Sequence, residues 1–572
     1  MWEQVLRAAE SPWFLPTILL LALGLRLWHV LALRAHPFFD NLQLDPRAYD
    51  EWAQQIAAGK LVGSSAFFVD PLYAYFLAGL YRLFGHSLLA VQLVQVLLGV
   101  GTCWLTALLG RCVLGQTGLG NLAGALMVAF LPAIHYGAVI EKTTLSVFLF
   151  TLALVLFFGS SRRASLGSGV ALGLAVLTRG NLLLFAPTGA AMLFFDRSVD
   201  NPHFRWQRMG LFLAGSFFMV SLATIHNWRA SGEFVLTTTN LGQNLYIGQH
   251  RGNALGAYDA PSFVRPDPRY EENDFRAEAE RRLGRTLTAS EVSGYWRNQA
   301  FVEMAAAPEA VVSRTLSKLR LFWHQYELPD NENLEVVAEY SSVLRLPLLG
   351  MGMLFPLALL GAVIGWRSNY RIRVLVGVTL LYLASVLAFF VLSRFRVQLV
   401  PSLAVLAVAA VAWLAEANMP RARLGFAILL VAIAATFSFT WPSWLVQRRL
   451  ANLAISYHGL GAQLASSGDL DAAIRSYERA VATAPSAVIV SMRELGTLYL
   501  RRGNFEAAER HMRNVVELKP QSRRGWTALT RLYEAMLATK RYRDDTVIKE
   551  KLAAAYRAAG SPDNAARLEG DS

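Results

Sequence analysis

Long runs of apolar residues recur along the chain, and they constrain its fold more than any other feature. Each run approaches the length that crosses a hydrocarbon core of roughly 30 Å. Spanning segments must be helices or a closed barrel, because lipid satisfies no backbone hydrogen bonds. Alternating ten-residue strands are absent from the sequence. We therefore predict an all-α polytopic helix bundle with about eleven spans, near 12–33, 87–109, 118–133, 143–159, 166–178, 182–196, 209–225, 346–366, 374–391, 397–415 and 424–443.

Composition supports a membrane protein. The 572 residues are 54% hydrophobic and only 17% charged, which is more apolar surface than one soluble core needs. The net charge of +13 is expected first in cytoplasmic loops, so we predict no nucleic-acid partner. Cys103 and Cys112 give neither a disulfide framework nor metal-ligand spacing.

The distribution of Lys and Arg between the predicted loops favours an N-terminus inside the cell. The first apolar run has no A-x-A cleavage site, so we interpret it as an anchor. An odd number of spans then places outer loop 1 (35–86), the large outer loop (226–345) and the C-terminal tail outside. We predict a multi-pass protein of the bacterial inner membrane with a periplasmic tail.

The tail beyond about residue 450 is polar and repetitive. Leu460-Gly461, Tyr477 and Pro485 recur 35 residues later as Leu495-Gly496, Met512 and Pro520, and a third unit begins at Trp526. This spacing of small and large residues is typical of tetratricopeptide helix pairs. We predict a membrane domain at 1–445 and a repeat domain at 450–572 that binds a protein partner or acceptor. The alternative is an amphipathic helical tail with accidental spacing.

Outer loop 1 contains the first acidic candidates. Tyr49, Trp52, Ala53 and Ile56 repeat at helical spacing after Asp45-Pro46, which predicts an amphipathic helix at the membrane interface. Asp45 itself has a simpler interpretation as the N-cap of this helix. Asp70-Pro71 opens a second amphipathic segment in the same way.

Further charged residues lie on the predicted outer side. Glu141-Lys142 ends a short loop, Arg179 follows the fifth span, and Arg394 and Arg396 follow the ninth. Arginine forks bind lipid phosphates well. The simpler interpretations are a solvated ion pair for Glu141-Lys142 and snorkelling for the arginines.

Other local patterns in the sequence are weak. Gly118-Leu119-Gly120 has no preceding strand, so we interpret it as helix packing and not nucleotide binding. The sequence contains no Walker motif, zinc spacing or nucleophile elbow. His135 and His324 are potential ligands, but ordinary hydrogen bonding is the favoured interpretation of both.

Together these pieces resemble glycosyltransferases of the GT-C superfamily, in particular bacterial proteins of the family 39 type, which are related to protein O-mannosyltransferases and lipid A aminoarabinose transferases. The resemblance covers roughly residues 10–440. Its motifs are Asp45-x-x-x-Tyr49-x-x-x-Ala53-x-x-Ile56-x-x-Gly59, Asp70-Pro71-Leu72-Tyr73, Leu83-Phe84-Gly85, Glu141, Thr178-Arg179-Gly180-Asn181, Asn227-Trp228-Arg229, Asn240-x-Gly242-x-Asn244-Leu245-Tyr246-x-Gly248, and Arg394-Phe395-Arg396 with Pro401. Relatives have Pro-Pro or Lys-Pro-Pro where this chain has Val69-Asp70-Pro71.

The resemblance implies roles for individual residues. Asp45 would be the catalytic base, with Asp50 as the fallback, and Glu141 would position the acceptor or a divalent metal ion (Mg, Mn or Zn). The phosphate of a polyprenyl-phosphate sugar would be bound by Arg179, Arg394 and Arg396. Residues assigned to acceptor or loop contacts are Tyr49, Asp70, His135 and Asn244. The family also implies inversion at the anomeric carbon by single displacement.

We therefore predict a membrane glycosyltransferase that moves a sugar from a polyprenyl-phosphate donor to a protein, glycan or lipid at the outer face. One alternative is a non-catalytic membrane anchor that displays the repeats as a scaffold. The other is a transporter of lipid-linked saccharide. A transporter predicts polar residues buried at mid-membrane, and Gln92 and Gln95 are the only close amide pair in the predicted spans.

Overall fold

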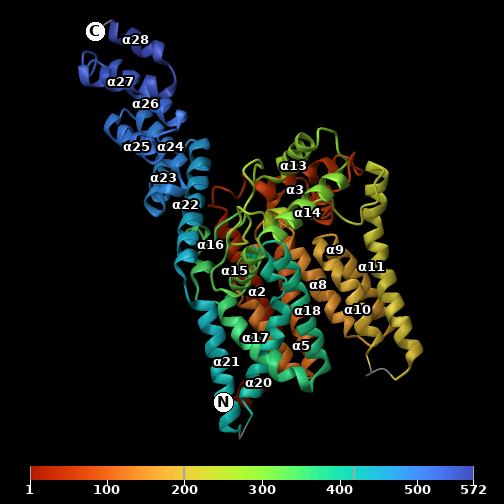
Figure 1. Ribbon diagram of the computed structural model, residues 1–572. Helices are drawn as coiled ribbons and strands as arrows, with labels where there is room; N and C mark the ends of the chain where they lie inside the picture. The colour runs from red at the N-terminus through yellow and green to blue at the C-terminus, as the bar shows by residue number, and fades with distance from the viewer. Residues whose placement is uncertain (1, 197–199, 417–418, 571–572) are drawn as a thin grey trace. The chain divides into compact units, whose positions relative to one another are not determined.

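The computed structural model describes residues 2–196, 200–416 and 419–570, drawn in Figure 1. Every named element in these ranges is a helix, and extended pairing is limited there to two isolated bridges, Phe130 with Leu349 and Ala257 with Val391. The chain divides into two compact units. The membrane unit comprises Met1–Ala35, Phe39–Leu334 and Tyr340–Thr440, and the repeat unit comprises His36–Phe38, Glu335–Glu339 and Trp441–Ser572.

Among the described residues, six helices are long and apolar enough to cross a membrane. They are α2 (Phe14–Leu33), α5 (Leu88–Leu114), α11 (Pro202–Ser231), α17 (Met351–Ser368), α18 (Tyr370–Ala388) and α21 (Arg421–Phe439). The other five predicted spans fall on shorter helices: α6 (Thr117–Val128), α8 (Thr143–Phe157), α9 (Arg162–Val176), α10 (Phe185–Phe194) after η1 (Gly180–Leu184), and α20 (Val400–Leu414). The all-α membrane bundle is confirmed, and the count of eleven spans stays a prediction.

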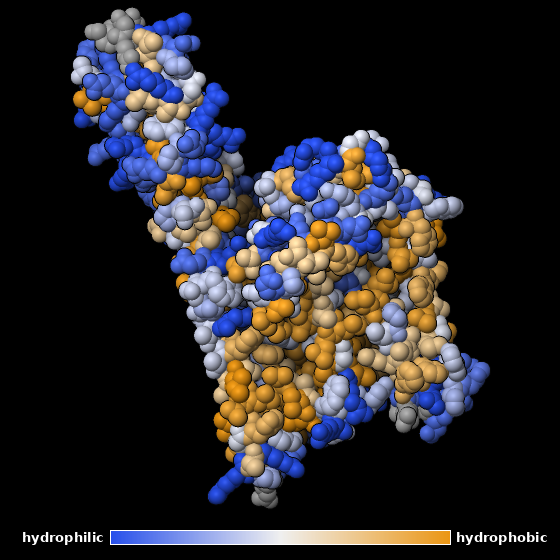
Figure 2. All heavy atoms as spheres, in the orientation of Figure 1, coloured by the Kyte–Doolittle hydropathy of each residue, from blue (hydrophilic) through white to orange (hydrophobic). Residues whose placement is uncertain are grey.

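The surface of the membrane unit agrees with a bilayer-spanning protein. Figure 2 shows hydrophobic side chains gathered over the middle of its helices and hydrophilic side chains at both ends. Exposed leucines, phenylalanines and isoleucines on α2, α11 and α21 contribute to this apolar belt. Such exposure is stable when lipid, not water, surrounds the side chains.

Small residues let the membrane helices approach closely. A Cβ on Gly120 would lie 2.5 Å from the Ala107 carbonyl oxygen, and a Cβ on Gly361 would lie 1.8 Å from that of Leu406. Both approaches exclude any side chain, as expected of helix interfaces in membranes. The interpretation of Gly118-Leu119-Gly120 as a packing motif is confirmed by the first contact.

Short helices gather with loops at one end of the membrane unit, where α3, α13 and α14 appear together in Figure 1. The helices in this group and beside it are α3 (Leu44–Ala57), α4 (Leu72–Phe84), α7 (Leu131–Tyr136), α12 (Leu241–Gln249), α13 (Pro268–Leu283), α14 (Ala289–Ala306), α15 (Pro308–Trp323), η2 (Ser342–Arg345) and α19 (Ser393–Val397). Helix α1 (Trp2–Glu10) instead packs on α6, and α16 (Leu334–Val337) falls mostly in the repeat unit. The large loop has its own core around Phe275 and Trp296, which also buries Phe390 and Leu392. This core fixes the loop against the segment that leads into α19.

The repeat unit consists of helix pairs. They are α22 (Ser443–Ser466) with α23 (Leu470–Thr483), α24 (Ile489–Arg501) with α25 (Phe505–Leu518), and α26 (Arg523–Leu537) with α27 (Thr546–Ala559), joined by η3 (Pro485–Ala487) and followed by α28 (Pro562–Gly570). A Cβ on Gly461 would meet the Tyr477 ring at 2.9 Å, and one on Gly496 would meet Met512 at 2.7 Å. The predicted alternation of small and large residues therefore packs each pair.

The division between the units falls at residue 440, slightly before the predicted boundary at 445–450. The reason is local. After α21 ends, Pro442 precedes a single helix, α22, which begins at Ser443 and continues into the first repeat. The polar composition that marks the repeats in the sequence begins only inside this helix.

Candidate functional site

Asp45 lies on the first turn of α3, where its backbone is strained. Leu44 has a φ of +49°, in the left-handed region that a branched side chain rarely adopts. Gln43 occupies the N-cap position and makes no side-chain capping bond. The Asp45 carboxylate instead pairs with Arg394 at 2.5 Å. The simpler interpretation of Asp45 as a helix cap is therefore wrong.

Arg394 joins three carboxylates from three separate segments. Its Nη1 lies 2.5 Å from Asp45 Oδ2 and 3.5 Å from Glu141 Oε2, and its Nε lies 2.9 Å from Asp330 Oδ2. Burial disfavours the charged guanidinium, but the three carboxylates outweigh it and hold the pKa of Arg394 well above its ordinary value. Burial, together with the charges of Asp45 and Glu141, raises the pKa of Asp330 to about 7 although Arg394 opposes the shift.

The short loop that ends at Glu141-Lys142 is fixed by amides from α5. Gln92 Nε2 donates to the Ala138 carbonyl at 2.9 Å, and Gln95 Nε2 donates to the Val139 carbonyl at 2.7 Å. Glu141 then accepts from the Thr143 backbone N–H at 3.1 Å and is only 1% exposed. The interpretation of Glu141 as part of a solvated ion pair is wrong. The amide pair that suggested a transporter orients this loop.

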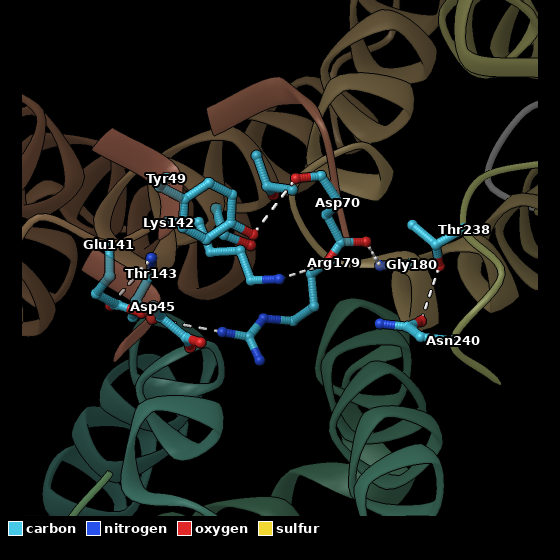
Figure 3. Close-up of polar contacts among 12 residues, drawn as sticks. Asp45, Tyr49, Asp70, Glu141, Lys142, Thr143, Arg179, Gly180, Thr238 and Asn240 are labelled. Atoms are coloured by element: carbon cyan, nitrogen blue, oxygen red, sulfur yellow. Dashed lines mark hydrogen bonds and ion pairs between the residues drawn. The ribbon is translucent and has the colours of Figure 1, made fainter. Parts of the chain in front are cut away.

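Asp70 and Lys142 form a second ion pair beside the first cluster. Lys142 Nζ contacts Asp70 Oδ2, while Asp70 Oδ1 accepts from the Gly180 backbone N–H at 3.1 Å. Figure 3 shows Lys142 pointing toward Asp70, with Gly180 on the other side of that carboxylate. Pro71 is the N-cap of α4 and makes no side-chain capping bond, so Asp70 does not cap α4.

The environment of Lys142 keeps it charged. Burial lowers its pKa, but the Asp70 carboxylate and Tyr49 outweigh burial, so the pKa lies above its ordinary value. Lys142 Nζ also lies 5.9 Å from the centre of the buried Tyr49 ring. The Tyr49 hydroxyl donates to the Asp70 carbonyl oxygen at 3.4 Å. Tyr49 and Asp70 are thus contact residues around Lys142.

Arg179 is a buried cation with few polar contacts. Its Nη2 donates to Thr143 Oγ1 at 3.4 Å, and its guanidinium lies 4.7 Å from the centre of the Phe395 ring. The side chain is 6% exposed and its Nε has no hydrogen-bond partner. No carboxylate of the described residues lies within 4 Å of it. A desolvated cation of this kind is stabilised by an anion.

Arg396 lies close to Arg394 in sequence but serves a different set of groups. Its guanidinium donates to the carbonyl oxygens of His324 at 2.6 Å and Tyr326 at 3.0 Å, and it pairs with Glu327 at 2.5 Å. The side chain is 1% exposed. These contacts hold the segment 321–327 in place, so we assign Arg396 to positioning that segment and not to donor binding.

Asp50 is separated from the Arg394 cluster by its own partners. Its Oδ1 accepts from the Tyr81 hydroxyl at 2.5 Å and lies 2.8 Å from His86 Nε2, and its Oδ2 accepts from Gln54 at 2.8 Å. These contacts join α3 to α4 and the turn after it. Asp50 therefore has the surroundings of a structural carboxylate.

The remaining predicted residues have structural surroundings. His135 is buried, 3.7 Å from a Glu332 carboxylate oxygen. His324 lies 3.2 Å from the Thr440 carbonyl oxygen and accepts from the Tyr326 N–H at 2.9 Å, which agrees with ordinary hydrogen bonding. Asn244 lies on α12, which packs on α14. None of these contacts involves Asp45, Lys142 or Arg179.

The residues of this site do not fit a divalent metal ion. No group of three or more His, Cys, Asp or Glu side chains in the described ranges is arranged to hold one. Asp45, Glu141 and Asp330 are the natural oxygen donors, but they surround the Arg394 guanidinium. Arg394 thus supplies the positive charge that a metal would bring to these carboxylates.

Two family models match parts of the chain. Residues 69–228 match the model described as dolichyl-phosphate-mannose-protein mannosyltransferase. This segment is mannosyltransferase-like. Residues 452–521 match the tetratricopeptide repeat. Both matches confirm the resemblance predicted from the motifs, and the mannosyltransferase-like segment includes Asp70, Glu141, Lys142 and Arg179.

Three solved structures align with the chain at low identity and low TM-score. The oligosaccharyltransferase AglB of Archaeoglobus fulgidus, with an inhibitory peptide and a dolichol-phosphate, has a TM-score of 0.39 and 13% identity and covers 78% of this chain, which spans 58% of AglB. An Archaeoglobus fulgidus oligosaccharyltransferase in the apo form has a TM-score of 0.37 and 12% identity. It covers 77% of this chain, which spans 58% of its length. ArnT of Cupriavidus metallidurans, bound to undecaprenyl phosphate, has a TM-score of 0.36 and 14% identity. It covers 90% of this chain, which spans 80% of ArnT. No curated protein sequence matches the chain.

Sequence reasoning missed two residues of this site. Asp330 lies in the large loop without a recognisable motif, and only the fold brings it to Arg394. Lys142 was noted beside Glu141 but not assigned a role, although a cation next to a buried acid at a membrane face is a detectable signal.

Proposed function

We propose that the protein is a membrane glycosyltransferase that moves a sugar from a polyprenyl-phosphate donor to an acceptor hydroxyl at the outer membrane face. One observation carries the proposal. A carboxylate cluster centred on Arg394 lies beside two cations, the buried Arg179 and the partly buried Lys142, and Thr143 adjoins both Glu141 and Arg179. A transferase of this kind needs a base and an anion site next to each other.

Arg179 and Lys142 are the proposed donor-phosphate ligands. Arg179 has spare donors and no carboxylate within 4 Å in the described part of the chain. Lys142 is held charged near it by Asp70. A phosphate would accept from both side chains and replace the missing counter-charge of Arg179. Nucleotide sugars stay in the cytosol, so a site at the outer face requires a lipid-carried donor.

Asp45 is the proposed base. Its carboxylate takes the proton of the acceptor hydroxyl while the hydroxyl oxygen forms a bond to the anomeric carbon. The bond from that carbon to the donor phosphate oxygen breaks, and its electron pair leaves with the polyprenyl phosphate, stabilised by Arg179 and Lys142. Attack opposite to the leaving group inverts the anomeric carbon. Arg394 holds the Asp45 carboxylate in orientation beside Glu141.

Because the Arg394 guanidinium already occupies the centre of the carboxylate cluster, the proposed mechanism uses no metal ion. We expect transfer to persist after EDTA treatment and dialysis. A loss of activity that Mg²⁺, Mn²⁺ or Zn²⁺ restores would overturn this part of the proposal.

The decisive experiment measures sugar release and transfer from a panel of radiolabelled polyprenyl-phosphate sugars, with the protein in lipid nanodiscs and a membrane extract as acceptor. We expect turnover by the wild type, loss of at least a hundredfold in Asp45→Asn, and a raised donor KM in Arg179→Gln and Lys142→Gln. Asp40→Asn, an exposed aspartate of the same loop, is the matched control. Equal rates in Asp45→Asn and the wild type would contradict the proposed base.

The repeat unit is the proposed recruitment domain for a protein partner or acceptor, because paired helices of this kind stack into an extended binding surface. Removal of a partner would lower transfer to a specific acceptor and leave acceptor-free sugar release unchanged.

A further inference from the structure

Helix α13 of the large loop packs against α3, the helix that carries Asp45. The contact is fixed at the start of α13, where Asp267 caps the helix and Arg269 lies 3.7 Å from Glu51 of α3. Glu51 is itself paired with Arg47 at 2.6 Å. Charged residues thus register the first turns of the two helices against each other.

Glu271 follows Arg269 on the buried side of α13. This residue is only 9% exposed, which is unusual for one that carries a carboxyl group. Burial raises the pKa of Glu271 to about 7, and the charge of Asp45 adds to this shift. The packing of α13 on α3 brings this carboxyl group toward the helix that carries Asp45.

Tyr258 approaches the same place from a different segment. The bridge between Ala257 and Val391 fixes its backbone, and the Val391 N–H donates to the Gly256 carbonyl at 3.0 Å. Its ring packs edge-on against Phe390 at 5.3 Å. The negative charges that raise the pKa of Tyr258, after burial, come from Glu271, Asp45 and Asp330. Tyr258 is thus positioned by the strand-like segment that leads to Arg394.

The two side chains meet beside the proposed base. The Tyr258 hydroxyl donates to Glu271 Oε2 at 3.5 Å. A neutral carboxyl that accepts from Tyr258 keeps one O–H for another partner. The neighbours of this pair are Asp45, Asp330 and the hydrophobic core of the large loop. The pair is therefore separate from the contacts of Lys142 and Arg179.

Resting on the proposed function, we infer that Tyr258 and Glu271 form the acceptor subsite and position the acceptor hydroxyl at Asp45. The subsite binds an oxygen of the acceptor next to the nucleophilic hydroxyl, through the Glu271 O–H and the Tyr258 hydroxyl. Both residues are positioning residues, because neither is placed to take the proton.

The charges around the subsite also restrict the acceptor class. Asp45 and Asp330 carry the negative charge beside it, and within the described residues Arg394 is the cation that pairs with both. An acceptor with a phosphate or carboxylate beside its nucleophilic hydroxyl would be repelled. The subsite fits an uncharged, hydroxyl-bearing acceptor such as a neutral sugar or a hydroxyl amino acid side chain.

The test compares acceptor kinetics with acceptor-free hydrolysis of the donor in nanodiscs, using membranes from cells that lack the protein as the acceptor source. In Glu271→Ala and Tyr258→Phe we expect the apparent acceptor KM to rise about tenfold or more, with the donor KM and the hydrolysis rate within twofold of wild type. Glu271→Gln keeps an N–H donor and an acceptor oxygen, so it should restore most of the lost affinity. Glu272→Ala is the matched control, since Glu272 bonds to Arg276 on the same helix.

Three outcomes separate the two proposals. Wild-type hydrolysis with unchanged acceptor KM in both Glu271→Ala and Tyr258→Phe overturns the acceptor subsite and leaves the proposed function standing. A matched rise in donor KM assigns the residues to the donor and also overturns it. Absence of any donor turnover by folded wild type overturns the proposed function, and the subsite with it.

Discussion

At the scale of single residues, two aspartates on α3 have opposite surroundings. Asp45 faces Arg394, whereas Asp50 accepts hydrogen bonds from Tyr81 and Gln54 and contacts His86. Asp50→Asn keeps the shape but leaves buried donors poorly matched, at a cost of about 1–3 kcal/mol. We expect a lower thermal unfolding temperature with transfer activity per folded molecule near wild type. A folded Asp50→Asn variant without activity would assign the base role to Asp50.

Glu271 gives the stability of the protein a defined pH dependence. Its pKa rises from 4.5 to about 7 on folding, with burial as the main cause. The folded state therefore binds a proton that the unfolded state releases between these values, so stability is lost as the pH rises through 7. Over that range the loss is about 3 kcal/mol. Glu271→Gln should flatten the curve between pH 5 and 8.

This pH prediction is measured as the difference between the unfolding temperatures of wild type and Glu271→Gln at each pH. Burial also raises the pKa of Asp330 and of Glu332 to about 7. Both proteins contain these two residues, so their contribution cancels in the difference and that of Glu271 remains. Parallel curves for the two proteins would show that Glu271 is ionised throughout.

At the scale of elements, α19 carries two arginines with separate tasks. Arg396 fixes the segment 321–327 through carbonyl oxygens and Glu327. Arg396→Gln would strand Glu327 and several carbonyls in a buried place, at a cost of about 3–5 kcal/mol. We expect a lower unfolding temperature and faster proteolysis within 321–339. Arg394→Gln strands Asp45, Glu141 and Asp330 and should also lower the unfolding temperature, but unlike Arg396→Gln it should reduce transfer per folded molecule as well.

Helices were largely predictable from the sequence because apolar run length and tetratricopeptide spacing are local signals. The first turns were not. Asp45 and Asp70 both precede proline, a pattern that indicates N-caps, yet each carboxylate bonds to a distant segment. Tertiary ion pairs in a buried site outweigh a cap, which is worth about 1 kcal/mol.

The site was predictable where its residues sit at conspicuous loop ends, as Glu141, Arg179 and Arg394 do. Asp330 and Glu271 were not, because the large loop has no repeating pattern and its approach to α3 depends on α12–α14 and their core. Arg396 shows the opposite error. It shares a motif with Arg394 but points to another set of groups, since residues two positions apart in a helix face opposite sides.

At the scale of the whole molecule, the end of α21 indicates on which side the repeats emerge. Ser438 accepts from the Gln325 N–H at 3.0 Å, and the Thr440 carbonyl accepts from Arg320 at 2.7 Å. Gln325 belongs to the segment 321–327 that Arg396 holds, and Arg320 immediately precedes that segment. The membrane unit therefore ends on the side of its candidate site, without any count of spans.

We accordingly expect the tail after residue 440 to face the same side as Asp45. Single cysteines at exposed positions test this in a Cys112→Ser background: Gln521→Cys in the repeat unit, Ser64→Cys in outer loop 1 and Ser160→Cys between α8 and α9. A membrane-impermeant maleimide should label the first two in cells with an opened outer envelope, and Ser160→Cys only after lysis. Labelling of Gln521→Cys together with Ser160→Cys would place the repeats on the opposite side, where they would bind cytosolic partners while the site geometry stayed the same.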